Sequence, residues 1–442
     1  MRVLFLQVLP SAFFFRLAVK FRNSGHSVYK INFSGGDMAF WNIASRSFNY
    51  KGTLDNLPEY YKNFLDKHHI DSVLLFGDCR PVHKAVMPVC KDLGIDVYVF
   101  EEGYLRPNWI TMDYYGTNWN SRALDDLDCL RKSYDRFLSQ GAYDNGEAVR
   151  SYFIKRAAND FVYNVCNSFL KPFFPGYKSH RPEWIYREYS GFVKRFLKSQ
   201  KYRKKYLKIC RDTIRKKEKF FLVPLQLDSD YQIREHSRFS SMHEFLETVF
   251  LSFRNHASKD SKLLVKLHPL DNGIQDYCKI TMNLAREHGL EKRVKAIDYV
   301  NLPSLLRTCR GVILVNSTVG FSALMNKKPV ITLGKALYDM PGITYQGNLN
   351  HFWLDAETFS PDKNLVNALR NLLIEKTQVN GGYFSQDGVR LSVDNAYTKI
   401  LKDKERLNRE KIDKTVNLRV QNVQRLKENY ELPVPLPARK VA

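Results

Sequence analysis

Two short polar motifs, each directly after an apolar run, carry residue types suited to binding a phosphate group. KLHP (Lys266–Pro269) follows Leu263–Val265, and NSTVG (Asn316–Gly320) follows Val312–Val315. If the apolar runs are parallel strands, both motifs lie at strand carboxyl ends, where open α/β sheets bind their ligands. Free backbone N–H groups at a helix start favour anions. Together the motifs predict a phosphate-bearing donor, namely a nucleotide sugar.

The candidate donor-binding residues of these motifs are Lys266, His268, Pro269, Asn316, Ser317 and Thr318. Pro269 keeps the backbone of His268 extended, and an imidazole at a strand end can hydrogen-bond a phosphate or protonate a leaving phosphate. The alternative is a buried histidine that serves packing alone. The Asn-Ser-Thr residues also suit a helix cap, which is compatible with a phosphate site. We expect the turn Lys335–Tyr338 to close the same pocket.

Carboxylates follow two other strand-like runs. Glu101, Glu102 and Gly103 come directly after Asp96–Phe100. A carboxylate at this strand end would face the cleft, where it can give or take a proton. The alternatives are a solvated pair of acids or a salt bridge to Arg106.

A second acidic motif, Gln226 to Asp230, follows the strand-like run Phe220–Leu225. Asp228 and Asp230 have the chemistry of a nucleophile, a base or a metal ligand, whereas the structural alternative is a turn or a helix cap. In the N-terminal part, the loop 77–83 supplies Arg80 and His83. Because arginine pairs bidentately with a carboxylate, Arg80 would suit an acidic sugar.

Two series of alternating strands and helices must position these motifs. The first series has expected strands at 2–8, 27–33, 72–76 and 96–100, with helices ending near 23 and at 57–68 and 84–93. The second has expected strands at 220–225, 263–267, 294–297, 311–315 and 329–333. Such alternation predicts parallel sheets covered by helices.

The expected fold class is α/β and GT-B-like: two Rossmann-like domains with a cleft between them and a helical C-terminal segment. A chain of 442 residues is long enough for two such domains. The expected N-terminal domain, on the acceptor side, spans 1–195 with a helical insertion at about 120–195. A basic helical linker at 196–218 leads to the donor-side domain at 219–390. A helix and a flexible Pro-rich tail at 391–442 complete the chain.

The net charge of +23 predicts an anionic partner. From Lys194 to Lys219 thirteen Lys or Arg face two acids, with apolar residues at about helical spacing. A basic amphipathic helix can lie on an anionic membrane surface, where each basic residue contributes about 1 kcal/mol. The alternative is a solvated helix that links two domains. Nucleic acid is not an expected partner, because no nucleic-acid-binding motif is present.

Cysteine usage and hydropathy indicate a cytoplasmic protein. No apolar run approaches the roughly 18–20 residues that span a bilayer. The apolar start of the chain fits a strand and a helix better than a signal peptide. The seven cysteines are scattered without C-x-x-C spacing, which argues against a zinc site and a disulfide framework and favours buried reduced thiols. No cofactor is expected.

The chain resembles the bacterial capsule polysaccharide synthesis family, and within it the single-module KpsS/LipB-type members, over about residues 1–360. Five segments carry the resemblance: FGDCRPVH, VFEEGYLRP, VPLQLDSDYQI, KLHP and NSTVGFSALMNKKPVITLGKALYDMPGIT. It implies a retaining β-Kdo transferase that uses CMP-Kdo to start the capsule's Kdo linker on phosphatidylglycerol. It also implies a place on the cytoplasmic face of a Gram-negative inner membrane, with the capsule biosynthesis and export complex as partner.

The resemblance also implies roles for single residues. Glu102 falls on the family's general acid/base, and Asp230 falls on its nucleophile, with Gln226 in the same Gln-x-x-x-Asp pattern. Asp228 remains a competitor for the nucleophile. The His-Pro and Ser/Thr motifs would bind the CMP phosphate, and the sugar would be retained through double displacement. No metal is expected.

Arg80 and Arg106 are the candidates for binding the carboxylate of Kdo. Two other functions remain open. One is a different nucleotide-sugar GT-B transferase, sialyltransferase-like or heptosyltransferase-like, which a donor screen would separate. The other is a non-catalytic adaptor that recruits capsule export machinery through its basic surface. Only an enzyme would need Glu102, Asp230 and His268 together.

Overall fold

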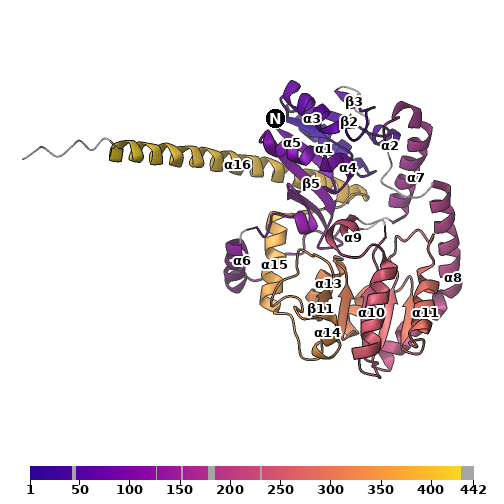
Figure 1. Cartoon of the computed structure of the whole chain (residues 1–442). Coiled ribbons are helices and arrows are strands. Elements are labelled where there is room, and N and C mark those ends of the chain that lie inside the picture. Colours follow the sequence, from indigo (N-terminus) through magenta and orange to yellow (C-terminus); the bar gives the residue numbers. More distant parts are fainter. Residues whose placement is uncertain (42–45, 126, 151–152, 178–184, 229–230, 430–442) are drawn as a thin grey trace, which may run out of the picture.

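Two α/β units lie one above the other in the computed structural model, and a long C-terminal helix extends from the side of the first unit (Figure 1). The structure describes residues 1–442 except 42–45, 126, 151–152, 178–184, 229–230 and 430–442. The two sheets are separate, with seven strands in the first and five in the second. The chain thus has the GT-B-like α/β architecture expected from the sequence.

The first sheet has the strand order β12-β6-β5-β4-β1-β2-β3. Its N-terminal elements are β1 (Arg2–Phe5), α1 (Ala12–Asn23), β2 (Ser27–Asn32), α2 (Gly35–Ala39), β3 (Ser47–Asn49), α3 (Leu57–Lys67), β4 (Ser72–Phe76), α4 (Pro81–Lys84), α5 (Val86–Asp92), β5 (Asp96–Glu102) and β6 (Trp109–Tyr114). The middle strands are almost wholly apolar, as in β4 (SVLLF), because helices cover both faces of a parallel sheet and leave neither face to solvent.

A mainly helical region follows, as expected for residues 120–195. It contains η1 (Asn118–Asn120), α6 (Leu127–Gln140), α7 (Phe153–Phe169), η2 (Lys171–Phe173) and α8 (Ile185–Arg215). The helix α8 runs along one edge of the molecule and leads into the second unit (Figure 1).

The second sheet has the order β11-β10-β7-β8-β9 and is parallel throughout. Its elements are β7 (Phe220–Pro224), α9 (Tyr231–His236), α10 (Met242–His256), β8 (Lys262–Lys266), α11 (Tyr277–Glu287), β9 (Val294–Ile297), α12 (Leu302–Thr308), β10 (Gly311–Leu314), α13 (Val319–Met325), β11 (Val330–Thr332), α14 (Leu349–Asp355) and α15 (Lys363–Lys376). The five strands confirm those expected from the sequence to within two residues at each end.

The four strands expected in the first unit pair in parallel, but the sheet also has an antiparallel edge that was not expected from the sequence. β6 runs antiparallel to β5, and β12 (Gln378–Asn380) runs antiparallel to β6. Pairing with β6 also extends β5 through Glu102, so the two glutamates form the last residues of a strand instead of the loop after it. A short antiparallel strand contributed from residue 378 has too little pattern of its own to be recognised in sequence.

The end of the chain returns to the first unit. After β12, the helix α16 (Gln386–Asn429) packs its first turns against α1 through Val389, Val393 and Ala396. The division into domains at 195, 219 and 390 stays a prediction. The strand β12 shows that residues before 390 already complete the first sheet.

The apolar stripe of the basic helix α8 faces the protein. Tyr206 and Cys210 are buried, and Tyr202 and Ile214 pack against the same core of the second unit. Apart from Leu207, the second half of this helix therefore offers a membrane mainly its basic side, and the expected amphipathic contact through these residues is not available. No helix within the described ranges is long and apolar enough to cross a membrane.

Two buried aspartates anchor the segment that carries η1. Asp78, after β4, accepts hydrogen bonds from Thr117 at 3.2 Å and from Asn120 at 2.7 Å. Asp113, on β6, accepts a bond from Ser121. This segment forms one wall of the pocket described below, so the two carboxylates fix a loop that the chain must hold at the interface of its two units.

Asp113 makes the stability of this segment depend on pH. Burial raises the pKa of Asp113 to about 7 from its ordinary 3.8, although hydrogen bonds from Ser121 and from the backbone N–H of Tyr114 oppose the rise. The folded protein therefore holds this proton more tightly than the unfolded chain does. The resulting stabilisation is complete below pH 3.8 and is lost as the pH rises through about 7.

We expect Asp113→Asn, which cannot ionise, to lower the dependence of the melting temperature on pH between pH 5 and pH 8. Each unit of pKa displacement corresponds to about 1.4 kcal/mol, so the variant should melt above wild type at pH 8. Thermal melts followed by circular dichroism measure this. Asp125→Asn removes the same charge from a side chain that is 67% exposed, and an equal effect of that control would contradict the prediction.

Candidate functional site

The carboxyl ends of the two sheets face each other across the interface between the units. Cys79, after β4, lies 3.8 Å (Sγ to Nε2) from His236 at the end of α9. Lys84 of α4 pairs with Glu235 at 2.6 Å. These contacts bring together the strand ends on which the sequence places its polar motifs.

Gln226 and Asn316 bind each other at the point where the strand order of the second sheet reverses. β7 lies between β10 and β8, and Gln226 and Asn316 follow β7 and β10. The Gln226 side chain donates to Asn316 Oδ1 at 3.0 Å and accepts the Asn316 backbone N–H at 3.1 Å. Ligands of such sheets bind at this reversal. The pair holds the ends of β7 and β10 in register. Both residues were predicted to bind the sugar donor.

The Asn-Ser-Thr motif leads into the short helix α13. Ser317 Oγ accepts the Val319 N–H at 3.2 Å, whereas Thr318, the residue at the N-cap of α13, makes no side-chain capping bond. The Tyr338 hydroxyl donates to the Ser317 carbonyl, and a Cβ on Gly320 would lie 2.1 Å from that hydroxyl oxygen. Glycine is required at 320 because the tyrosine passes directly over the backbone.

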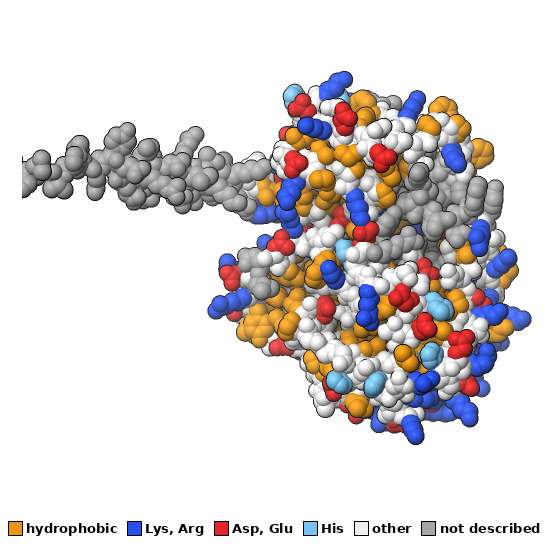
Figure 2. All heavy atoms as spheres, viewed as in Figure 1, with side chains coloured by type: hydrophobic (Ala, Val, Ile, Leu, Met, Phe, Trp, Pro, Cys, Tyr) orange, Lys and Arg blue, Asp and Glu red, His pale blue; other side chains and the backbone are white. Residues whose placement is uncertain are grey.

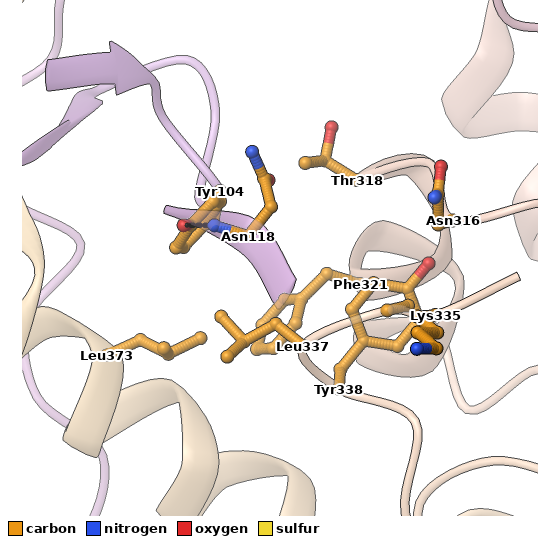
Figure 3. Close-up of a pocket in the computed structure, with 10 residues that line it drawn as sticks. Tyr104, Asn118, Asn316, Thr318, Phe321, Lys335, Leu337, Tyr338 and Leu373 are labelled. Atoms are coloured by element: carbon orange, nitrogen blue, oxygen red, sulfur yellow. Dashed lines mark hydrogen bonds between the residues drawn. The ribbon is translucent and has the colours of Figure 1, made fainter. Parts of the chain in front are cut away.

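A pocket opens between the units beside this motif (Figure 3). Asn316, Thr318, Lys335 and Tyr338 line one side, which confirms that the turn 335–338 closes a pocket shared with the Asn-Ser-Thr motif. The rest of that turn and residues of other elements complete the pocket: Ala336 and Leu337, with Tyr104, Asn118, Phe321 and Leu373. Tyr104 and Asn118 come from the first unit, so the pocket exists only when both units are in place.

Two contacts shape the pocket wall that the first unit contributes: one lies within that unit, and the other crosses the interface between the units. The Asn118 backbone N–H donates to the Tyr104 hydroxyl, drawn as a dashed line in Figure 3. The Lys335 ammonium lies 5.5 Å from the centre of the Trp119 ring. A cation over an aromatic face is stabilised by the ring's electron density, so Lys335 is held at the pocket's edge.

His268 is neutral and has a defined tautomer. Its Nδ1 accepts the Leu270 N–H at 3.1 Å, which leaves the proton on Nε2. Burial lowers the pKa of His268 to about 3, and positive charges at Lys266, Arg106, Arg195 and Arg156 lower it further in that order. His268 is therefore a hydrogen-bond donor and holds no extra proton to give to a leaving phosphate.

Lys266 and Pro269 occupy different environments on either side of this histidine. Lys266 is buried at the end of β8, where its ammonium donates to the Leu267 carbonyl at 3.2 Å. Burial lowers its pKa. Pro269 is exposed. Lys266 thus acts on the site mainly through its charge, and Pro269 through the shape of the loop.

Arg195 of α8 holds the His-Pro loop in place. Its guanidinium pairs with both carboxylate oxygens of Asp298, at 2.8 and 3.2 Å. It also donates to the carbonyls of His268 at 2.8 Å, Pro269 at 3.4 Å and Asp271. Both members of the ion pair are less than 10% exposed. A planar group with five donors is needed for this arrangement, so the arginine fixes the orientation of His268.

Glu102 lies at the end of β5 and pairs with Arg156 of α7 at 2.6 Å. The same Arg156 is close enough to His268 for its charge to act on the imidazole. The salt bridge to Arg106 that sequence allowed is replaced by Arg156, and Arg106 instead donates to the Gly103 carbonyl at 3.1 Å. A Cβ on Gly103 would lie 1.9 Å from the Trp109 carbonyl, so only glycine fits the β5–β6 turn.

Arg80 and His83 serve different roles in the loop after β4. Arg80 donates to the Gln7 side chain at 3.2 Å, next to the point where the strand order of the first sheet reverses between β1 and β4. His83 is fully buried, and its Nδ1 lies 2.6 Å from the Gly77 carbonyl. Arg80 remains near the cleft, whereas the position of His83 suits support of the loop.

Asp228 has a structural setting. Its carboxylate accepts the Met242 N–H at 2.8 Å and the hydroxyl of Tyr277. These bonds tie the loop after β7 to the starts of α10 and α11. Asp230 lies outside the described residues, so the choice between the two aspartates stays a prediction.

Arg156, Arg195, Tyr104 and Asn118 were missed by sequence reasoning. Asn118 and the two arginines lie in a loop or helices without a strand-end motif, and α7 and α8 have no signal that would point to a cleft. The run VFEEGYLRP does contain Tyr104, and it was the one available indication.

Comparison with known proteins agrees with the motif resemblance. The family of capsule polysaccharide biosynthesis proteins matches residues 71–384. The capsule polysaccharide export protein KpsS of Escherichia coli is 33% identical over 384 residues, which cover 87% of this chain and 97% of KpsS. The capsule polysaccharide modification protein LipB of Neisseria meningitidis serogroup B is 34% identical over 388 residues, covering 87% and 92% of the two chains. Among solved structures, the β-Kdo 2,7 transferase KpsC of Thermosulfurimonas dismutans matches with a TM-score of 0.40 at 15% identity, covering 91% and 100%.

The contacts of Arg195 predict that a conservative change at this position destabilises the His-Pro loop. Arg195→Lys keeps the charge but cannot bridge Asp298 and three carbonyls. We expect a loss of about 2–3 kcal/mol in unfolding free energy, measured by chemical denaturation. Arg203→Lys, on the exposed side of the same helix, is the control. An unchanged unfolding free energy in Arg195→Lys would exclude the positioning role.

Proposed function

Because this chain belongs to the family of capsule polysaccharide biosynthesis proteins, we propose that it is a retaining β-Kdo transferase. It takes Kdo from CMP-Kdo and transfers it to phosphatidylglycerol, the first step of the capsule's lipid linker. The proposal rests on the glycosyltransferase-like fold, on relatives named for capsule export and modification, and on the motif resemblance from which the identity of the sugar comes.

One observation carries the proposal: cations from both units act on a neutral histidine, and one of them also pairs with a carboxylate at a strand end. Lys266, Arg106 and Arg156 all act on His268, and Arg156 also pairs with Glu102. A cluster of positive charge of this kind is matched by an anionic donor and repels other cations. Glu102, held by the same Arg156, supplies the acid/base group that glycosyl transfer needs.

In the proposed complex the Nε2–H of His268 donates to the phosphate of CMP, together with the Ser317 and Thr318 hydroxyls. Lys266 contributes positive charge from its buried position at the end of β8. CMP departs with a single phosphate, so hydrogen-bond donors and cations suffice to stabilise it. Arg80 or Arg106 binds the carboxylate of Kdo.

Transfer then takes two displacements with one inversion each. The Asp230 carboxylate attacks the anomeric carbon of Kdo, and the bond to the phosphate oxygen breaks with its electrons staying on CMP. The acceptor hydroxyl next attacks the same carbon, Glu102 takes its proton, and Asp230 leaves. The sum is CMP-Kdo plus acceptor alcohol giving Kdo-acceptor plus CMP and a proton. The structural bonds of Asp228 support Asp230 as the nucleophile.

The acceptor places the reaction at the cytoplasmic face of the inner membrane of a Gram-negative cell. In the proposal the protein is peripheral there and works with the capsule biosynthesis and export machinery. The exposed basic side of α8 supplies electrostatic attraction to anionic lipid.

Substitution of the neighbouring glutamates tests the assignment of the acid/base. We expect Glu102→Gln to lower the rate of Kdo transfer to a fluorescent phosphatidylglycerol by about a thousandfold. Chromatographic separation of the fluorescent product from the substrate measures this rate. Glu101→Gln, the matched change one residue away, should keep most of the activity. The assignment fails if Glu101→Gln loses the activity and Glu102→Gln keeps it. The enzyme proposal fails if wild type forms no product with CMP-Kdo, which is the result expected of an adaptor for export.

A covalent intermediate tests the double displacement. Without its base, Glu102→Gln should complete the first step and stall at the second, so incubation with CMP-Kdo should add one Kdo residue to the protein. Intact-mass analysis and peptide mapping should place it on Asp230, and Glu102→Gln combined with Asp230→Ala should remain unlabelled. Label on Asp228 instead would reassign the nucleophile.

A further inference from the structure

The helix α7 has its polar side inward and its apolar side outward. Inward, Tyr163 donates to Asp37 at 3.2 Å and Asn159 donates to the Pro10 carbonyl at 3.1 Å. Asn167 accepts the Gly36 N–H at 2.7 Å. A helix on the surface of a soluble protein normally has the opposite arrangement, so hydrogen bonds hold α7 on the first unit while its apolar residues face away.

The outward residues of α7 form one continuous stripe. They are Ile154, Ala158, Phe161, Val162 and Phe169, all exposed and separated by spacings that fall on one side of an α-helix. Ile154 is 83% exposed and Phe169 is 79% exposed. Large side chains that are this exposed, in one stripe, mark an interaction site.

More exposed apolar side chains lie on η2 and on the first half of α8. Phe173, Val193, Phe196 and Leu197 are each more than half exposed. The two helices are in contact where the rings of Phe161 and Tyr189 meet at 5.3 Å. Of the seventeen exposed large hydrophobic side chains among the residues described, nine lie between 154 and 207. We call this surface the α7–α8 apolar face.

Basic residues border the α7–α8 apolar face. Lys155 and Lys171 flank the stripe at the two ends of α7, and Lys194 and Lys201 flank it on α8; all four are exposed. Figure 2 shows hydrophobic side chains over α7 and Lys and Arg side chains along the outer edge beside α8. An apolar strip with a basic border matches the boundary between acyl chains and anionic headgroups.

The same helix reaches the proposed active site. Arg156, in the first turn of α7, pairs with Glu102, two residues from the outward Ile154. Two residues apart on an α-helix point to nearly opposite sides, so the apolar stripe and the Arg156–Glu102 pair lie on opposite sides of the same helix turn. A single helix therefore joins the α7–α8 apolar face to the proposed acid/base group.

We propose that the α7–α8 apolar face inserts into the surface of an anionic bilayer and so holds the enzyme at the membrane that contains its lipid acceptor. The inference rests on the proposed function for the identity of the acceptor. It differs from attraction by the basic side of α8 alone, because the apolar face adds a contact that salt does not screen.

Flotation with vesicles tests the proposal without any donor sugar. Wild type should float with vesicles of phosphatidylglycerol and phosphatidylcholine and should remain partly bound at high salt. Phe161→Asp combined with Phe169→Asp should bind at least about tenfold more weakly, because two aromatic side chains no longer leave water. The binding that this double variant retains should vanish at high salt.

The control is Leu354→Asp on α14, an apolar side chain that is 60% exposed on the second unit. It should bind vesicles like wild type. Equal binding by wild type and the double variant, or an equal loss in Leu354→Asp, would overturn the proposal. Circular dichroism melts establish that the variants are folded. Since no donor is present, failure of Kdo transfer would leave these results unaffected.

Depth of insertion gives a second measurement. In Phe169→Trp, brominated lipids should quench the added fluorescence, whereas in Leu354→Trp they should not. The other occupant to consider is a second copy of this chain. Two results together would overturn the membrane assignment. Wild type would be a dimer that Phe161→Asp combined with Phe169→Asp converts to a monomer, and brominated lipids would not quench the added fluorescence of Phe169→Trp.

Discussion

The buried ion pair between Arg195 and Asp298 is the interaction on which the proposed site depends. Burying two charges is costly unless each is fully hydrogen-bonded. Here the guanidinium uses its remaining donors on the carbonyls of the His-Pro loop, so the desolvation cost is offset only when that loop adopts one conformation. Arg195 of α8 can therefore be buried only when the His-Pro loop, and with it His268, has this orientation.

The cationic environment of the site follows from the same constraint. His268 lies among positively charged side chains from the first unit, from α8 and from β8, and it stays neutral because burial and those charges act in one direction. Its proton lies on Nε2 because Nδ1 accepts a backbone N–H. The site thus combines fixed positive charge with a hydrogen-bond donor. Arg156, which lies on α7, pairs with Glu102 and so connects the charges around His268 to that glutamate and to the helix.

Sequence patterns predicted the strand ends well and the supporting residues poorly. Short apolar runs with polar motifs after them located β7 through β11, His268 and the Asn-Ser-Thr turn, because a buried parallel strand must be apolar and its end must be polar. Gln226 and Asn316 were correctly placed at the same edge, but their mutual hydrogen bonds depend on the spacing of β7 and β10. The antiparallel pairing of β6 and β12 joins residues more than 260 positions apart, and no local pattern reports such a contact.

What the sequence by itself determined is the α/β class, the family, and which residue types stand at the strand ends. Those properties follow from periodicity and local motif, which neighbouring residues fix. Only the tertiary structure decided which cation pairs with Glu102, which arginine holds the His-Pro loop, and which face of α7 points outward. An amphipathic pattern gives the two sides of a helix but not their direction. Hydrogen bonds from Tyr163 and Asn159 to distant segments turn the polar side of α7 inward and leave its apolar side at the surface.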